Sequence, residues 1–174
     1  MSDTLETLTI GEYTIEVYHD WDTDSPREWD NLGTLVCFHK RYDLSDTKWD
    51  FDTFVQDILR DGSNVILPVY MYEHSGICIS TEPYGDRFDS GLVGHVYVTK
   101  ERLQEEYGDC ENATERAIAV MKREIETFSQ YLEGDVYSFV ILKEGEIIDS
   151  CFGIYGYEHC LAEAKDQLEY ITSD

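Results

Sequence analysis

Basic residues are scarce in this sequence. Only 13 Lys and Arg stand against 37 Asp and Glu, which gives a formal net charge of −24. Nucleic acids and anionic membranes carry charge of the same sign and would repel the chain. We therefore expect no direct binding to nucleic acid or to a membrane. The partners that the charge favours are cationic, either a basic protein surface or metal ions. Adaptation to high salt is another explanation of the charge, although five cysteines count against it.

Closely spaced cysteines and long apolar runs are also missing. The five cysteines include no CxxC pair, which argues against a structural zinc site and against a disulfide framework. No run of 18 apolar residues occurs, so no transmembrane helix is predicted. The first residues, Met1-Ser2-Asp3-Thr4, lack the basic and apolar regions of a signal peptide. These absences predict a reduced, cytoplasmic setting.

Prolines are few, with Pro26, Pro68 and Pro83 scattered along the chain. No internal repeat, low-complexity tract or linker divides the sequence. A chain of 174 residues has the size of one domain and can bury a sizeable core. We therefore predict a single globular domain over residues 1–174.

Apolar periodicity predicts both strands and helices. Alternation on both sides of Gly11-Glu12 predicts an amino-terminal hairpin, and Glu144-Gly145 is a typical tight turn for a hairpin over 135–142 and 147–155. Further strands are predicted over 33–39, 64–73, 76–81 and 91–99, with Pro68 at a sheet edge or bulge. One predicted helix has an apolar face formed by Phe51, Phe54, Val55, Ile58 and Leu59. Other helices are predicted over 100–107, 112–133 and 157–171.

These elements predict the fold class. Short connections between successive strands favour antiparallel pairing. The predicted fold is α+β, with a mainly antiparallel, twisted sheet and three to four helices packed on one face.

The densest polar stretch runs from His19 to Asn31. Asp20, Asp22 and Asp24 alternate as in a calcium-binding loop, whose oxygens point at one hard cation. The stretch departs from the EF-hand because Ser25 stands at the glycine position and Asn31 at that of the bidentate glutamate. A looser calcium or magnesium site and a solvated acidic turn both stay open. We assign no metal ligands and no cofactor.

No catalytic signature emerges. Cys37 and His39 lie roughly 7 Å apart along one predicted strand, a stretched geometry for a thiol–imidazole dyad. His39, His74 and His95 are ligand or base candidates only if the fold brings them together. A strand follows Asp89-Ser90-Gly91, whereas a phosphate cradle needs a helix there. We name no catalytic residue and do not expect an enzyme.

Four segments carry a family resemblance: residues 25–34 (SPREWDNLGT), 37–42 (CFHKRY), 74–77 (HSGI) and 89–94 (DSGLVG). Through these segments the chain resembles a family of uncharacterised proteins of bacteriophages and prophages. The resemblance extends from about residue 20 to 155. The resemblance implies a phage context and a location in the cytoplasm of an infected host cell. It implies no activity and no site residue.

Charge and resemblance together suggest a phage-type acidic interaction protein that imitates DNA and inhibits a host defence or DNA-binding protein. Its 24 charges match about 41 Å of duplex, close to the diameter of a globule of this size. The partner would be the basic surface of a host defence or DNA-handling protein. The predicted partner-binding carboxylates are Asp20, Asp22, Asp24, Glu28, Asp30, Asp43, Asp46, Asp50 and Asp52.

Two alternatives stay open. One is a metal-dependent enzyme or metal-binding protein that uses the carboxylates of residues 20–30. The other is a phage accessory protein without mimicry, whose charge keeps it soluble. The net charge is −10 over residues 1–62 and −7 over 134–174, against −3 over 63–99 and −4 over 100–133. The sequence therefore places the excess toward the two ends of the chain.

Overall fold

The computed structural model describes residues 3–74, 76–85 and 89–173. The chain forms two compact units, unit 1 from Met1–Asp24 with Gln130–Asp174, and unit 2 from Ser25–Ser129. Each unit contains its own four-stranded sheet. A single domain over residues 1–174 stays a prediction. Met1, Ser2 and Ser75, which belong to sequence segments discussed above, lie outside the described residues.

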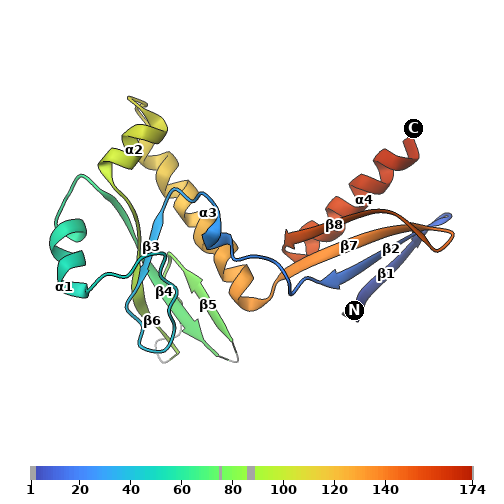
Figure 1. Ribbon diagram of the computed structural model, residues 1–174, viewed down its shortest axis with the longest axis horizontal. Helices are drawn as coiled ribbons and strands as arrows, with labels where there is room; N and C mark the ends of the chain where they lie inside the picture. The colour runs from blue at the N-terminus through green and yellow to red at the C-terminus, as the bar shows by residue number, and fades with distance from the viewer. Residues whose placement is uncertain (1–2, 75, 86–88, 174) are drawn as a thin grey trace. The chain divides into compact units, whose positions relative to one another are not determined.

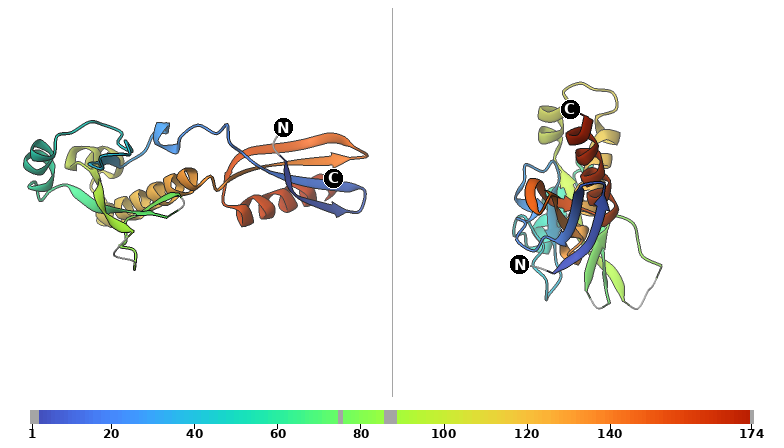
Figure 2. Two further views of the ribbon diagram at one scale, coloured as in Figure 1. Left: turned by 90° about the horizontal axis from the view of Figure 1, so that it is seen from below. Right: turned by 90° about the vertical axis from the view of Figure 1, so that its right-hand side faces the viewer.

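Unit 1 is an antiparallel sheet with one helix on it. Its strands are β1 (Thr4–Ile10), β2 (Tyr13–His19), β7 (Val136–Lys143) and β8 (Glu146–Tyr155), in the order β1-β2-β7-β8 (Figure 1). Helix α4 (Tyr157–Ser173) packs on β2, β7 and β8, along one face of the sheet (Figure 2, left). The core between them consists of Ile15, Val17, Phe139, Ile141, Ile154, Cys160, Ala164 and Leu168.

The predicted hairpins of unit 1 are confirmed. Glu144 has φ +53° and Gly145 has φ +86°, and Lys143 pairs with Glu146 across them. Positive φ at both central residues is the geometry whose twist suits a two-residue hairpin, and glycine adopts it without steric cost. The two hairpins are joined by the pairing of β2 with β7, in which residues 13–19 lie against residues 137–143.

Unit 2 contains a second antiparallel sheet, in the order β3-β6-β4-β5. Its strands are β3 (Thr34–Cys37), β4 (Val65–Glu73), β5 (Ile77–Ser80) and β6 (Ser90–Val98). Its helices are η1 (Pro26–Glu28), α1 (Phe51–Phe54) with the π-helical η2 (Val55–Leu59), α2 (Lys100–Tyr107) and α3 (Ala113–Glu133), whose last turn belongs to unit 1. The buried side of α3 includes Ala113, Ala117, Met121, Ile125 and Phe128.

Gly94 permits the pairing of β3 with β6. A Cβ atom at this position would lie 1.9 Å from the carbonyl oxygen of Val36. Gly91 in the same strand has nothing within 4 Å of such an atom. Only Gly94 of the two is therefore required for a close backbone approach, which accounts structurally for part of the segment 89–94.

The α+β class with mainly antiparallel strands is confirmed, but the strands form two sheets and not one. The predicted stripe of the 51–59 helix is wrong at Phe51, which is 56% exposed, while Phe54 is fully buried. After one α-helical turn the chain continues with i to i+5 hydrogen bonding. The apolar side chains before and after this change therefore do not lie on one face of a regular α-helix. Pro68 lies where β5 does not pair with β4, next to an irregularity after Val69, as predicted.

Across residues 3–74, 76–85 and 89–173, no helix combines the length and the apolar composition needed to cross a membrane.

Candidate functional site

Three of the predicted site carboxylates, Asp20, Asp22 and Asp24, lie in unit 1 directly after β2. Asp20 is held in place because its N–H donates to the Val136 carbonyl at 2.9 Å. Its carboxylate accepts the Gly153 N–H of β8 at 2.9 Å and the Asp22 N–H at 3.3 Å. Asp22 and Asp24 are exposed. The segment therefore lies against β8 and presents two carboxylates to solvent.

The remaining six lie in unit 2, where several of them have basic neighbours. Asp30 lies 3.5 Å from the Arg102 guanidinium, and Asp43 lies 3.3 Å from the Lys48 ammonium. Both pairs are at the surface, where an ion pair contributes little to stability. The basic partners nevertheless reduce the negative field at these two positions.

Asp50 has a structural role at the start of α1. Its carboxylate accepts the Thr53 N–H at 3.0 Å, which is an N-cap. Hydrogen bonds from the side chain and backbone of Thr53 hold the pKa of Asp50 below its usual value. Glu28 and Asp52 are exposed.

Asp46 belongs to a mostly buried ionic cluster of unit 2. Arg27 donates from Nε to Asp46 at 2.9 Å and from Nη2 to the Gly33 carbonyl at 2.7 Å. Glu124 of α3 accepts the N–H groups of Leu32 and Gly33 at 2.6 and 3.0 Å. The Arg27, Asp46 and Glu124 side chains are 7%, 19% and 12% exposed, and burial raises the pKa of Glu124. This cluster fixes residues 25–35 against α3.

The nine predicted carboxylates are therefore divided between the two units, and five of them already have partners inside the chain: Asp20, Asp30, Asp43, Asp46 and Asp50. The prediction that they bind a partner stays a prediction. Their density along the sequence reflects both local structural roles and surface charge.

The part of the chain that the structure describes contains no group of three or more His, Cys, Asp or Glu side chains placed to hold a metal ion. Asp20, Asp22 and Asp24 do not converge as the oxygens of a calcium loop would. The metal-dependent alternative thus has no geometric support within these residues.

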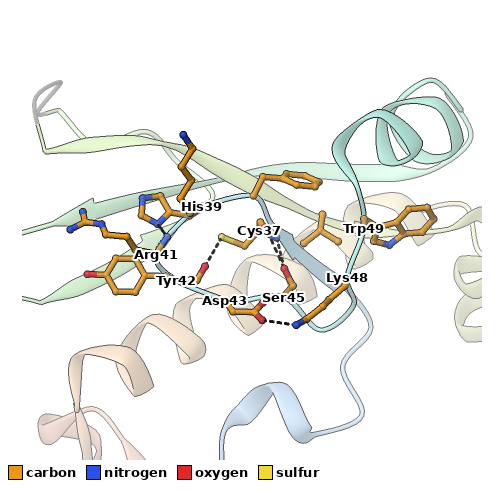
Figure 3. Close-up of a pocket in the computed structure, with 11 residues that line it drawn as sticks. Cys37, His39, Arg41, Tyr42, Asp43, Ser45, Lys48 and Trp49 are labelled. Atoms are coloured by element: carbon orange, nitrogen blue, oxygen red, sulfur yellow. Dashed lines mark hydrogen bonds and ion pairs between the residues drawn. The ribbon is translucent and has the colours of Figure 1, made fainter.

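A cavity of about 350 Å³ lies under the loop that follows β3 (Figure 3). Ser45 ties the loop back to the strand, because its hydroxyl accepts the Cys37 N–H at 2.8 Å and donates to the Cys37 carbonyl at 3.2 Å. The lining residues labelled in Figure 3 are Cys37, His39, Arg41, Tyr42, Asp43, Ser45, Lys48 and Trp49.

Two of the three Lys and Arg side chains that line this cavity are paired with neighbouring carboxylates. Arg41 pairs with Glu73 at 2.5 Å, and Lys48 pairs with Asp43 at 3.3 Å. In Figure 3 the Arg41 and Lys48 side chains extend toward different ends of the loop. Arg41 and Lys48 are therefore partly neutralised, and Lys40 is the remaining Lys or Arg among the lining residues.

Cys37 and His39 do not form a catalytic dyad. The Cys37 thiol donates to the Tyr42 carbonyl at 3.8 Å, and the His39 ring stacks on Tyr42 with centroids 5.2 Å apart. His39 Nδ1 accepts the Arg41 N–H at 3.4 Å. Thiol and imidazole thus have separate partners.

The other two candidate histidines have neighbours of their own. His74 lies 3.7 Å from Asp89, and His95 packs on Phe54 with ring centroids 5.6 Å apart. Burial lowers the pKa of His95, which favours a neutral imidazole. His95 is thus half-buried against an aromatic ring, whereas His74 is exposed beside a carboxylate.

The strongest concentration of charge is in unit 1. Its 69 residues include 17 Asp and Glu and two lysines, a net charge of −15, whereas the 105 residues of unit 2 carry −9. Helix α4 contributes exposed carboxylates, which are Glu158, Glu163, Asp166 and Glu169. The excess charge lies toward both ends of the sequence, and the fold joins these two ends in one unit.

Comparisons with protein-family models, with curated proteins and with solved structures each find no match.

Proposed function

We propose that this chain is an acidic interaction protein that binds a basic protein surface through the carboxylates of unit 1, in competition with DNA. The observation that carries the proposal is the charge of unit 1, −15 in 69 residues with two lysines. A field of this sign and density attracts proteins that bind polyanions.

The density suits a mimic of a short duplex. Duplex DNA carries one charge per roughly 1.7 Å, so 15 net charges correspond to about 26 Å of duplex. Helix α4 has 17 residues and a length of about 26 Å at 1.5 Å per residue. The total charge of unit 1 therefore equals that of a duplex as long as α4, and α4 itself carries four of the carboxylates and one lysine.

Helix α4 is a rigid carrier for part of this charge. Cys160, Ala164 and Leu168 are buried against the sheet, which fixes the helix on one side. Glu163, Asp166 and Glu169 follow at intervals of three residues, about 4.5 Å of rise each, and all three are exposed. Charges held on a packed helix cost a partner little ordering entropy on binding.

The resemblance to proteins of phages and prophages suggests the class of partner. A host defence protein or a DNA-handling protein has a basic DNA-binding surface, and an acidic phage protein in the infected cytoplasm would block it. The alternative without mimicry, in which the charge serves solubility alone, predicts no partner that responds to neutralisation of unit 1.

Immobilised protein incubated with bacterial lysate at about 0.05 M and about 0.5 M NaCl tests the proposal, because screening weakens charge-led contacts. The test variant carries Glu163→Gln, Asp166→Asn and Glu169→Gln. The matched control carries Glu105→Gln, Glu111→Gln and Glu126→Gln, which remove the same charge from exposed positions of unit 2.

We expect the wild type to capture a protein at low salt and to release it at high salt. The unit 2 control should capture the same protein, whereas the α4 variant should bind it about tenfold more weakly. Equal loss in the two variants would contradict the assignment to unit 1. A capture that salt does not change would contradict binding led by charge.

A further inference from the structure

Strand β8 exposes three large apolar side chains at one edge of the acidic unit. Ile147 and Phe152 are each 65% exposed, and Ile148 is 42% exposed. Strand β8 is the outer strand next to β7 in the order β1-β2-β7-β8. We call Ile147, Ile148 and Phe152 the β8 patch. Exposed apolar side chains gathered on one edge strand mark an interaction surface more often than isolated ones do.

The irregular pairing of β8 explains this exposure. Successive pairs between β7 and β8 skip from Asp149 to Ile147 and from Ile154 to Cys151, so Ile148 and Phe152 lie at the two irregularities. Such bulges redirect side chains out of the regular alternation. Ile147 pairs with Leu142, whose neighbour Ile141 faces the core under α4, so Ile147 lies on the opposite face.

Carboxylates flank the β8 patch at both ends. Glu144 and Glu146 are exposed at the hairpin turn beside Ile147. At the other end the Asp20 carboxylate accepts the Gly153 N–H, directly after Phe152, and the exposed Asp22 follows. Ile147 and Phe152 are five residue steps apart along the strand, a span of about 17 Å.

We infer that the β8 patch is an apolar anchor by which unit 1 holds the basic partner: the partner would present an apolar strip between two clusters of Lys or Arg that meet the carboxylates at the two ends of β8, and it would reach the α4 carboxylates around the edge of the sheet. This inference rests on the proposed function, since the charge complementarity selects the occupant. Protein interfaces commonly place a desolvated apolar centre inside a polar rim, and the centre carries most of the binding energy.

The same charges oppose a second copy of this chain as the occupant. Pairing two β8 edges would bring together two units of −15 each. Like charges around an exposed edge are a device that prevents self-association of strands. The edge is thus unfavourable for its own copy and favourable for a strand or loop with basic flanks.

The test uses two synthetic peptides, each with two lysines at both ends. One has a centre of alternating Val and Phe, and the other has a Gly-Ser centre of equal length. The test variant is Ile147→Ser with Phe152→Ser, and the control is Leu5→Ser with Ile10→Ser on the opposite edge strand β1, where both residues are 46% exposed. All four changes are at exposed positions and leave the net charge unchanged.

We expect the Val-Phe peptide to bind the β8 variant about tenfold more weakly than the wild type, a loss of about 1.4 kcal/mol. The Gly-Ser peptide should bind both equally, and the β1 control should bind both peptides like the wild type. If each peptide binds the wild type and the β8 variant with the same affinity, the β8 patch is not an apolar anchor, although binding led by charge would still hold. Failure of the Gly-Ser peptide to bind at low salt instead contradicts the proposed function.

Analytical ultracentrifugation of the wild type and the β8 variant tests whether a second copy of this chain binds the β8 patch. A monomer for both proteins supports the inference. A wild-type dimer that the β8 variant loses assigns the patch to a second copy and contradicts the inference.

Discussion

At the scale of single residues, two of the four segments quoted for a resemblance to phage proteins contain residues with structural roles. Arg27 and Gly33 of residues 25–34 take part in the buried ionic cluster with Asp46 and Glu124. Gly94 of residues 89–94 allows β3 and β6 to approach. These residues stabilise unit 2 and need no functional explanation.

Gly94→Ala tests the close approach. Its Cβ would lie 1.9 Å from the Val36 carbonyl oxygen, so β3 must shift, and we expect a loss of about 2 kcal/mol or more in the free energy of unfolding. Gly91→Ala is the matched control in the same strand, with nothing within 4 Å. Urea unfolding of both variants makes the comparison, and equal stabilities would show that the approach is not limiting.

Glu124 predicts a pH dependence of stability. Burial raises its pKa in the folded state, so the folded protein binds the proton more tightly than the unfolded chain does. Stability from this group is present below the ordinary glutamate range and is lost as the pH rises through the raised pKa. The stability of the wild type relative to Glu124→Gln should therefore fall as the pH rises above the ordinary glutamate range and through this raised pKa. Urea titrations across this range measure it, and a rise with pH would be the opposite of the expected sign.

At the scale of elements, the features that could be predicted from the sequence are those set by residues close together in the chain, such as turns and helix ends. The hairpin at Glu144-Gly145 and the helix ending at Gly134 follow from turn chemistry and periodicity, and both are present. The π-helical turn after Phe54 leaves no comparable signal in one sequence. The pairing of β2 with β7 joins distant residues, and strand patterns do not specify a partner strand.

The packing of α4 on its sheet predicts which of the five cysteines reacts most slowly with an alkylating reagent. Cys160 is fully buried on the sheet side of α4, and burial raises its pKa from 9.0 to about 11. Cys37, Cys78, Cys110 and Cys151 are partly exposed. Pulsed alkylation at pH 8 with mass spectrometry should modify Cys160 last, at the rate at which α4 undocks. Modification of Cys160 as fast as Cys110 would show that α4 is not stably packed.

At the scale of the whole molecule, the fold concentrates charge that the sequence had placed at two distant ends. Residues 1–24 and 130–174 form unit 1, and the charge of −7 over residues 134–174 thereby joins that of the amino-terminal strands. The predicted site carboxylates, from Asp20 to Asp52, lie where Asp and Glu are dense along the chain. The exposed carboxylates of α4 cannot be assigned to the same unit as Asp22 and Asp24 from the sequence, since that unit is formed by long-range strand pairing.

A net charge of −24 predicts that salt stabilises the protein. Mutual repulsion destabilises the compact state, and raising NaCl from about 0.1 M to about 1 M shortens the Debye length from about 10 Å to about 3 Å. Thermal unfolding followed by circular dichroism should show Tm rising by several degrees. A Tm that falls over this range would mean that attractive ion pairs outweigh repulsion.

Displacement by DNA tests the central claim most directly. A protein captured by the wild type in a salt-sensitive manner is bound to the immobilised chain, and a duplex of about 26 Å or longer is titrated against it at fixed low salt. The account predicts stoichiometric release, with mutually exclusive binding of DNA and of this chain. A ternary complex, or a partner that stays bound at saturating DNA, would contradict the proposal that unit 1 occupies a DNA-binding surface.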